Sequence, residues 1–310
     1  MKVTVVGAGN VGATVANVLA HKDIVQEIVL LDLKGDLAKG KALDTWEQSP
    51  IDYYSTRLKG TSDYADTANS DVVVITAGIP RKPGMSRDDL ISTNAKIVTS
   101  VVKSILTHTP NPIIIIVSNP LDVMTYAAYK VAGLDSSRVF GMAGILDTGR
   151  YRSFLAEALD CSPKDVAAVL MGGHGDTMVP LPRYTTVAGI PVTELIDEAP
   201  LNAIIERTKK GGGELVKLMG TSAWYAPGAA AAQMVESIVK DDKRIFPCCV
   251  RLDGQYGLSD MYLGVPVKLG RNGIESIIEL DLNDAEMKSL HESAAHVSKV
   301  MDTFKGMAIV

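Results

Sequence analysis

The chain has 310 residues, of which 46% are hydrophobic and 22% are charged, and these ordinary globular proportions exclude a disordered or collagen-like protein. At roughly 150 residues per domain, the length predicts two domains or one large one. The formal net charge is −5 and no cluster of Lys or Arg stands out, which argues against nucleic acid as a partner.

The cysteines and the apolar runs indicate the compartment. The three cysteines are Cys161, Cys248 and Cys249. They make neither a disulfide framework nor a zinc-site spacing, so we expect small buried side chains in a reducing compartment. The longest continuous apolar run, Ile113 to Val117, is too short to cross a membrane. Three glycines interrupt the N-terminal apolar stretch, so we expect no signal peptide and a cytoplasmic protein without a membrane partner.

The first half of the chain alternates strand and helix patterns. The predicted strands are 3–6, 28–31, 56–59, 72–75, 113–117 and 139–140, and the clearest helices are 88–106 and 121–131. Continuous apolar runs are expected for strands that are covered on both faces. This alternation predicts a doubly wound parallel sheet with right-handed crossovers.

The second half has a different pattern. It predicts helices over 147–159, 203–219 and 229–240, a strand over 166–171, and a strand pair over 261–269 and 274–280. A last helix follows Asn283, which can cap it together with Glu286. We therefore predict an α/β domain over residues 1–142 and an α+β substrate domain over residues 143–310.

A glycine-rich turn follows the first predicted strand. Gly7-Ala8-Gly9-Asn10-Val11-Gly12 fits G-x-G-x-x-G, and the expected helix then begins. Asp32 ends the second strand 20 residues beyond Gly12, where an acid can hold the ribose hydroxyls of a dinucleotide. The pattern predicts a Rossmann domain that binds NAD, because a carboxylate repels the 2′-phosphate of NADP. Nearby Lys34 leaves NADP as the alternative.

Three further segments carry unusual polar content. Residues 77–87 form a Gly- and Pro-bounded loop with three cations, which suits a lid over an anion or an ordinary solvated loop. Asp147 and Arg150 lie three residues apart, on one helix face, where they could also form a simple ion pair. His174 lies among glycines in 172–176, on bent and exposed backbone, although a lone His is more often structural.

Together these segments resemble the lactate/malate dehydrogenase family, most closely its bacterial lactate-dehydrogenase-like malate dehydrogenases. The resemblance covers essentially the whole chain. It rests on the glycine turn, Asp32, the 77–87 loop, Asn94, Val117-Ser118-Asn119-Pro120, and the segments 146–150 and 172–176.

The resemblance implies a role for each catalytic residue. His174 would give and take the proton of the reacting oxygen, and Asp147 would hold His174 and stabilise its charged form. Arg150 would grip the first carboxylate of the substrate as a bidentate fork. Arg87 would polarise the reacting carbonyl. These residue types suit hydride transfer to a ketone, since His works as acid and base near neutral pH.

Arg81 would determine which substrate is used. The family has Gln at this loop position in many lactate enzymes and Arg in malate enzymes, so Arg81 would bind the second carboxylate of oxaloacetate. Lys82 could share this role, and Ala223 would leave room in the same pocket.

The resemblance also implies the remaining contact residues. Substrate-binding positions would be Arg81, Arg87, Asn119 and Arg150. Cofactor-binding positions would be Gly7, Ala8, Gly9, Asn10, Val11, Gly12, Asp32, Asn94, Val117, Ser118 and Asn119.

We therefore expect an NAD-dependent malate dehydrogenase that acts on a small dicarboxylate, without a metal. A homo-oligomer is implied, with a tetramer favoured over a dimer. The alternatives are a lactate or other 2-hydroxy acid dehydrogenase, an NAD-dependent glycosidase, which would need metal ligands, and a non-enzymatic NAD sensor.

Overall fold

The computed structural model describes residues 1–80 and 86–307, and its centre is a nine-stranded sheet. The strands lie in the order β14-β13-β12-β6-β5-β4-β1-β2-β3. The first six in the sequence are β1 (Lys2–Val6), β2 (Glu27–Leu31), β3 (Arg57–Thr61), β4 (Val72–Ile75), β5 (Ile113–Ile116) and β6 (Val139–Gly141). All pairs among these six are parallel, which confirms the predicted doubly wound sheet.

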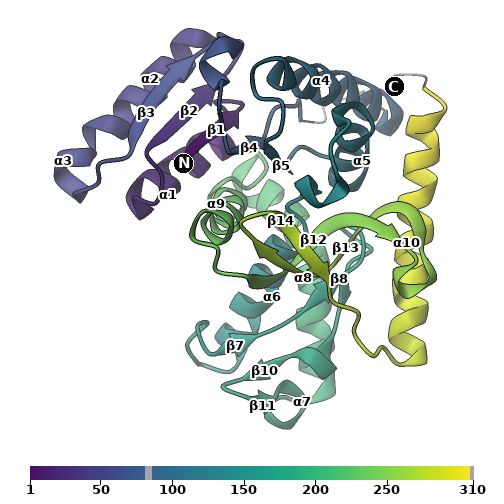
Figure 1. Cartoon of the computed structure of the whole chain (residues 1–310). Coiled ribbons are helices and arrows are strands. Elements are labelled where there is room, and N and C mark those ends of the chain that lie inside the picture. The colour runs from purple at the N-terminus through teal and green to yellow at the C-terminus, as the bar shows by residue number, and fades with distance from the viewer. Residues whose placement is uncertain (81–85, 308–310) are drawn as a thin grey trace.

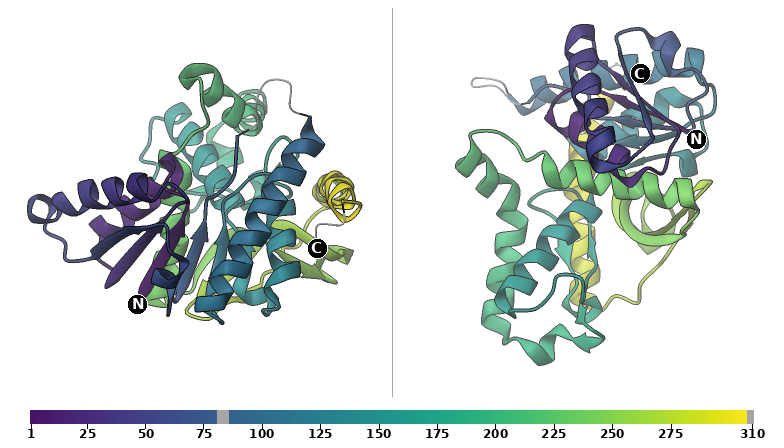
Figure 2. Two further views of the ribbon diagram at one scale, coloured as in Figure 1. Left: turned by 90° about the horizontal axis from the view of Figure 1, so that it is seen from above. Right: turned by 90° about the vertical axis from the view of Figure 1, so that its left-hand side faces the viewer.

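Helices cover both faces of the parallel part (Figures 1 and 2). They are α1 (Asn10–Lys22), α2 (Gly35–Glu47), α3 (Ser49–Asp52), α4 (Arg87–His108) and α5 (Leu121–Ala132). From β1 the strand order runs one way to β3 and the other way to β6, so right-handed crossovers place α1 and α2 opposite α4 and α5. Every residue of β4 and β5 is buried, which explains why their apolar runs do not alternate.

The direction of the strand order reverses between β1 and β4. These neighbours are in register from Val3 beside Val72 to Val6 beside Ile75, so their carboxyl ends meet at one edge. Ligands of open α/β sheets bind in the crevice at such a switch point. The glycine turn and residues 77–80 both leave the sheet here.

Three antiparallel strands of the second half extend the same sheet: β12 (Arg244–Asp253), β13 (Ser259–Gly270) and β14 (Gly273–Ile277). A single residue pair, Cys249 with Gly141, joins β12 to β6. The predicted strand pair is confirmed as β13 and β14. The long strand β12 was missed, because its burial is nearly continuous rather than alternating and Pro247 lies within it.

The lower part of the molecule in Figure 1 holds most of the other elements of the second half. Its helices are α6 (Gly144–Ala158), α7 (Val192–Leu195) and α8 (Glu198–Met219), and its strands are β7 (Val166–Ala167), β8 (Leu170–Met171), β9 (Val179–Pro180), β10 (Thr186–Val187) and β11 (Ile190–Pro191). Helix α9 (Tyr225–Lys240) lies higher and packs against α1. The prediction of one strand over 166–171 is wrong. β7 pairs with β10 and β8 pairs with β9, so the segment divides between two small sheets.

The last helix, α10 (Asp284–Lys305), packs along α4 and α5 and beside the second half (Figure 1). The predicted cap is confirmed: Asn283 accepts a hydrogen bond from the Glu286 backbone, and the Glu286 side chain accepts one in return. The apolar stripe of α10, from Leu290 to Phe304, is buried in the main core. This helix thereby ties the C-terminal part of the chain to the nucleotide-binding half.

Candidate active site

The glycine turn between β1 and α1 has the shape that a pyrophosphate requires. Gly7 has φ +104°, which L side chains rarely adopt, and a Cβ on Gly12 would lie 1.8 Å from the Gly7 carbonyl oxygen. A Cβ on Gly9 would meet nothing within 4 Å, so the turn is open there. No side chain caps the start of α1, which leaves its N–H groups for an anion.

Asp32 lies beside this turn at the end of β2. Its Oδ2 atom accepts a hydrogen bond from the Ala8 N–H at 2.7 Å, and its Oδ1 atom accepts one from the Lys34 N–H at 2.9 Å. The carboxylate is therefore fixed at the mouth of the glycine turn. An open turn, a free helix start and an anchored acid fit a dinucleotide, with its pyrophosphate on α1 and a ribose on Asp32.

The ends of β4 and β5 are fastened to each other by buried polar side chains. Asn94 donates to the carbonyl oxygens of Asn119 at 2.7 Å and Ile79 at 3.1 Å, and its Oδ1 atom accepts from the Ile79 N–H at 2.8 Å. The Ser118 hydroxyl donates to the Ala77 carbonyl at 2.5 Å. Asn94 therefore braces the 77–80 segment, and its predicted contact with the cofactor stays a prediction.

Asp147, Arg150 and His174 meet in one cluster. Asp147 and Arg150 lie one turn apart on α6, and His174 follows β8. The His174 Nδ1 atom lies 2.8 Å from Asp147 Oδ2, and Arg150 Nη1 lies 3.3 Å from Asp147 Oδ1. The Asp147 side chain is 2% exposed, the Arg150 side chain 12% and the His174 side chain 20%. One buried carboxylate thus holds an imidazole on one oxygen and a guanidinium on the other.

The surroundings favour the charged form of the imidazole. Burial lowers the pKa of His174, but the charge of Asp147 and its hydrogen bond to the ring raise it, and the net shift is upward from the usual 6.5. Because Nδ1 is engaged by Asp147, Nε2 is the ring atom that can exchange a proton with a ligand. The cluster therefore combines a proton donor with a neighbouring fixed cation.

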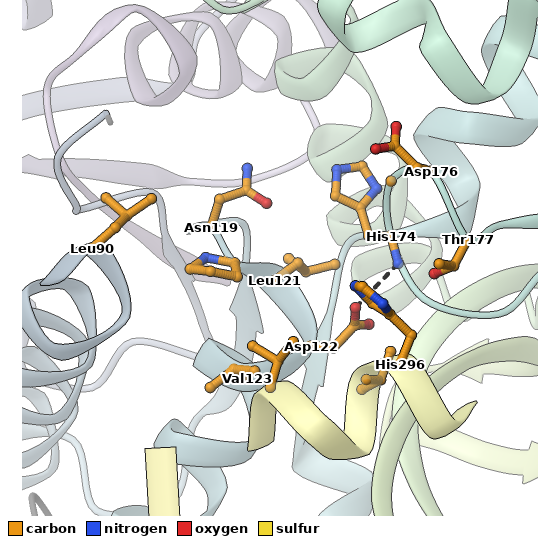
Figure 3. A pocket seen from close by; sticks show the side chains of 13 residues that line it. Leu90, Asn119, Leu121, Asp122, Val123, His174, Asp176, Thr177 and His296 are labelled. Atoms are coloured by element: carbon orange, nitrogen blue, oxygen red, sulfur yellow. Dashed lines mark hydrogen bonds between the residues drawn. The ribbon is translucent and has the colours of Figure 1, made fainter. Parts of the chain in front are cut away.

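A cavity of about 480 Å³ opens beside His174 (Figure 3). Its walls come from the start of α4, the 119–123 segment, the 174–177 segment and one face of α10. Asn119 lies across this cavity from His174, and His296 enters it from α10. His296 has no sequence motif around it, but the fold brings it to the cavity of His174.

Comparisons with known proteins agree with this geometry. Residues 1–141 match the model of the lactate/malate dehydrogenase NAD binding domain, and residues 145–307 match that of the lactate/malate dehydrogenase alpha/beta C-terminal domain. The chain belongs to the lactate/malate dehydrogenase family. The resemblance inferred from the motifs is therefore confirmed, as is NAD as the cofactor.

Full-length relatives are similar throughout. The chain is 65% identical over 308 residues to the malate dehydrogenase of Cytophaga hutchinsonii, with 99% of each chain covered. It is 60% identical over 302 residues to that of Salinibacter ruber, with 97% of this chain and 96% of that one covered. The solved Salinibacter ruber malate dehydrogenase structure superposes with a TM-score of 0.96 at 57% identity, covering 99% of this chain and 98% of that one.

Within this family fold, Asp122 is a site residue that sequence reasoning missed. Its Oδ2 atom accepts a hydrogen bond from the His174 backbone N–H at 3.1 Å, drawn as a dashed line in Figure 3. Burial raises the pKa of Asp122 to about 6. Among the described residues its Oδ1 atom has no hydrogen-bond partner, and the Cys249 thiol faces the carboxyl group. The sequence signal that could have identified Asp122 is an acid in the first turn of α5, directly after Asn119-Pro120.

Two of the loop arginines predicted for this family site are not placed. Arg81 and Lys82 lie outside the described residues, and of Arg87 the structure gives only the backbone, as the first residue of α4. Ala223 precedes α9 and is half-buried. The roles predicted for Arg81, Arg87 and Ala223 therefore stay predictions.

Residues 1–80 and 86–307 contain no group of three His, Cys, Asp or Glu side chains that could hold a metal ion. Within the same ranges, every helix is too short or too polar to cross a membrane.

Proposed function

We propose that the chain catalyses reversible hydride transfer between (S)-malate and NAD, which gives oxaloacetate and NADH. The observation that carries this proposal is the His174–Asp147–Arg150 cluster, an acid–base group beside a fixed cation in a fold with a dinucleotide turn. The predicted activity is confirmed by the full-length relatives named malate dehydrogenase. Lactate as the substrate is less well supported.

His174 carries the proton in this mechanism. NAD, when bound, supplies or accepts the hydride. During reduction of the ketone, negative charge develops on the carbonyl oxygen, and the imidazolium neutralises it by donating the Nε2 proton. Asp147 keeps the ring oriented through Nδ1 and stabilises the imidazolium before transfer. In the direction of malate oxidation, neutral His174 takes the hydroxyl proton.

Arginines position the substrate. We assign Arg150 to the first carboxylate, because a guanidinium offers two parallel N–H donors to one carboxylate group. Its side chain is mostly buried, so water competes weakly for that contact. We assign Arg87 to the reacting carbonyl and Asn119, which lines the cavity of His174, to substrate and cofactor.

Arg81 is the residue that we propose to select the substrate. A dicarboxylate supplies a partner for this cation, whereas pyruvate would leave a desolvated Arg81 unpaired, at a cost of several kcal/mol. The direct test is the ratio of kcat/KM for oxaloacetate and pyruvate with NADH. We expect Arg81→Gln to shift this ratio towards pyruvate by orders of magnitude, with Lys82→Gln as the matched control.

If Arg81→Gln instead lowers both rates by the same factor, Arg81 is not the discriminating residue. Lys82 then becomes the candidate. Arg150→Gln provides a second comparison, because its proposed partner occurs in both substrates. It should damage both reactions alike.

The cofactor contacts are proposed on the same basis. Residues 7–12 would hold the pyrophosphate and Asp32 the adenosine ribose, with Val117, Ser118 and Asn119 near the nicotinamide. Asn94 would contact the cofactor, and its hydrogen bonds to Ile79 also brace the 77–80 segment. The open glycine turn and the anchored Asp32 support this set.

We further propose a cytoplasmic homotetramer that serves the tricarboxylic acid cycle, with domains over 1–142 and 143–310. Exposed apolar side chains on α2 and α8, which include Leu43, Leu218 and Met219, support a self-association surface. Light scattering coupled to size-exclusion chromatography tests the tetramer directly, since a dimer has half the mass.

A further inference from the structure

Three consecutive glycines lie in the middle of a long helix. Gly211, Gly212 and Gly213 occupy the central part of α8 (Glu198–Met219). Glycine is the poorest helix former except for proline, so a run of three needs a local reason. None of the three has a positive φ, so backbone conformation does not supply that reason.

Only the first glycine faces a neighbour. Gly211 is buried, whereas Gly212 and Gly213 are exposed. A Cβ built on Gly211 would lie 2.2 Å from Cδ, 2.6 Å from Nε and 3.3 Å from Cζ of Arg150. Carbon atoms in contact normally lie about 3.5–4.0 Å apart. A Cβ on Gly212 or Gly213 would meet nothing within 4 Å.

The Arg150 side chain therefore lies in the space left by the missing side chain of Gly211. Its guanidinium is fixed at the other end by Asp147, at 3.3 Å, and Asp147 also holds His174. Helices α6 and α8 pack against each other in the lower half of Figure 1. The two helices thus approach each other through this arginine as well as through the apolar cluster that includes Leu155 and Leu201.

A methyl group at position 211 would move the arginine before it moves the helices. The atoms in conflict belong to a flexible side chain and not to backbone. Arg150 and Gly211 also line one cavity of about 640 Å³, bordered by α1, α6, α8 and α9, into which a displaced guanidinium can swing. The fold should survive such a change, while the geometry of Arg150 should not.

We propose that Gly211 is a positioning residue. Because it has no side chain, it leaves the space in which Arg150 lies in the position to bind the first carboxylate of the substrate. This inference rests on the proposed function of Arg150. It concerns Gly211 alone, so Gly212 and Gly213 serve as controls in the same helix with the same change in helix propensity.

The test compares Gly211→Ala, Gly212→Ala and Gly213→Ala in the full-length protein. Melting temperature reports folding, and NADH fluorescence titration reports the cofactor site. Steady-state kinetics with oxaloacetate report the proposed carboxylate contact. We expect all three variants to fold and to bind NADH within about twofold of wild type.

Only Gly211→Ala should lose activity. A misplacement of a positioning group by about 1 Å costs about 100-fold, and we expect kcat/KM for oxaloacetate to fall by about that factor, with a raised KM. Gly212→Ala and Gly213→Ala should stay within about threefold of wild type. If Gly211→Ala matches these two controls, the inference is overturned.

A double variant separates a contact with Arg150 from a general packing defect. Arg150→Ala removes the atoms that conflict with a methyl group at 211. In the Arg150→Ala background, Gly211→Ala should therefore not lower the melting temperature. It should also leave the residual kcat/KM unchanged. If Gly211→Ala alone fails to fold, recovery of folding in the double variant supports the proposal, and failure of both overturns it.

The same experiment distinguishes failure of the proposed function. A folded, NADH-binding wild type without turnover of oxaloacetate would contradict the function itself. Normal turnover of wild type with equal kinetics in all three alanine variants would contradict only the role of Gly211.

Discussion

The free energy of unfolding of the Asp122→Asn variant, compared with that of wild type, should increase as the pH rises. The carboxyl group lies beneath the backbone of His174 and is 7% exposed. Burial raises the pKa of Asp122 to about 6 from an ordinary value of 3.8, so the folded state prefers the protonated acid. Asn keeps an oxygen that can accept from the His174 N–H but has no proton to lose.

The size of the effect follows from the shift. Two pKa units correspond to about 3 kcal/mol at about 1.4 kcal/mol per unit. Because the folded pKa is raised, this contribution is fully present below pH 3.8 and is lost as the pH rises through about 6. About half of it, roughly 1.4 kcal/mol, is lost between about pH 5 and about pH 8. The raised pKa of His174 acts in the same direction, since its contribution also falls as the pH increases.

Equilibrium urea unfolding at fixed protein concentration, repeated from about pH 5 to about pH 8, measures this difference. The free energy of unfolding of Asp122→Asn minus that of wild type should increase by about 1–2 kcal/mol across the range. A pH-independent difference in the free energy of unfolding reflects the exchanged hydrogen bond and does not affect the predicted pH dependence. Asp302→Asn, which removes an exposed carboxylate from α10, controls for the loss of one charge. A difference that stays flat with pH would refute the assignment of a buried, titrating Asp122.

Two further predictions concern cofactor choice and chemistry. Asp32→Ser should lower kcat/KM for NADH and reduce the preference for NADH over NADPH, because it removes the carboxylate beside the glycine turn. A wild type whose kcat/KM is already higher with NADPH would contradict this. His174→Asn should lower kcat by about 10²–10⁴-fold while NADH still binds in a fluorescence titration, because the proposed mechanism places the ring at the reacting oxygen and the cofactor mainly on residues 7–32. If the variant keeps most of its activity, His174 does not take part in the chemistry. In the wild type, the rate of malate oxidation should rise with pH through a pKa above 6.5.

Local patterns predicted the nucleotide-binding half well, because its decisive interactions are short in sequence. The continuous apolar runs of β4 and β5 follow from burial on both faces, and the glycine turn follows from backbone geometry within six residues. Asp32 could be placed because β1 and β2 are neighbours joined by one helix. In each case the interacting residues lie close together in the sequence, so a local pattern can indicate both.

The residues that escaped prediction act across long sequence separations. Asp122 reaches His174 over 52 residues, and Gly211 meets Arg150 over about sixty. Neither a buried acid nor a helical glycine has a local pattern that specifies its partner. His296 is a similar case, because nothing in the helical periodicity of α10 indicates which wall of a cavity the helix supplies.

The charges of the described site show why the 77–87 segment matters to substrate choice. Around His174 the structure places one permanent cation, Arg150, and three acids: Asp122, Asp147 and Asp176. With His174 protonated, these groups sum to a net charge of −1 when Asp122 is ionised and to zero when Asp122 is protonated. Asp147 is already shared by the arginine and the imidazole, so Arg150 can serve one carboxylate but does not offset a dianion. A dicarboxylate substrate therefore needs further cations, and we propose that Arg81, Lys82 and Arg87, which follow β4 in the sequence, supply them. A monocarboxylate has no such need, which is why a change of charge at Arg81, rather than at Arg150, should alter the preference between oxaloacetate and pyruvate.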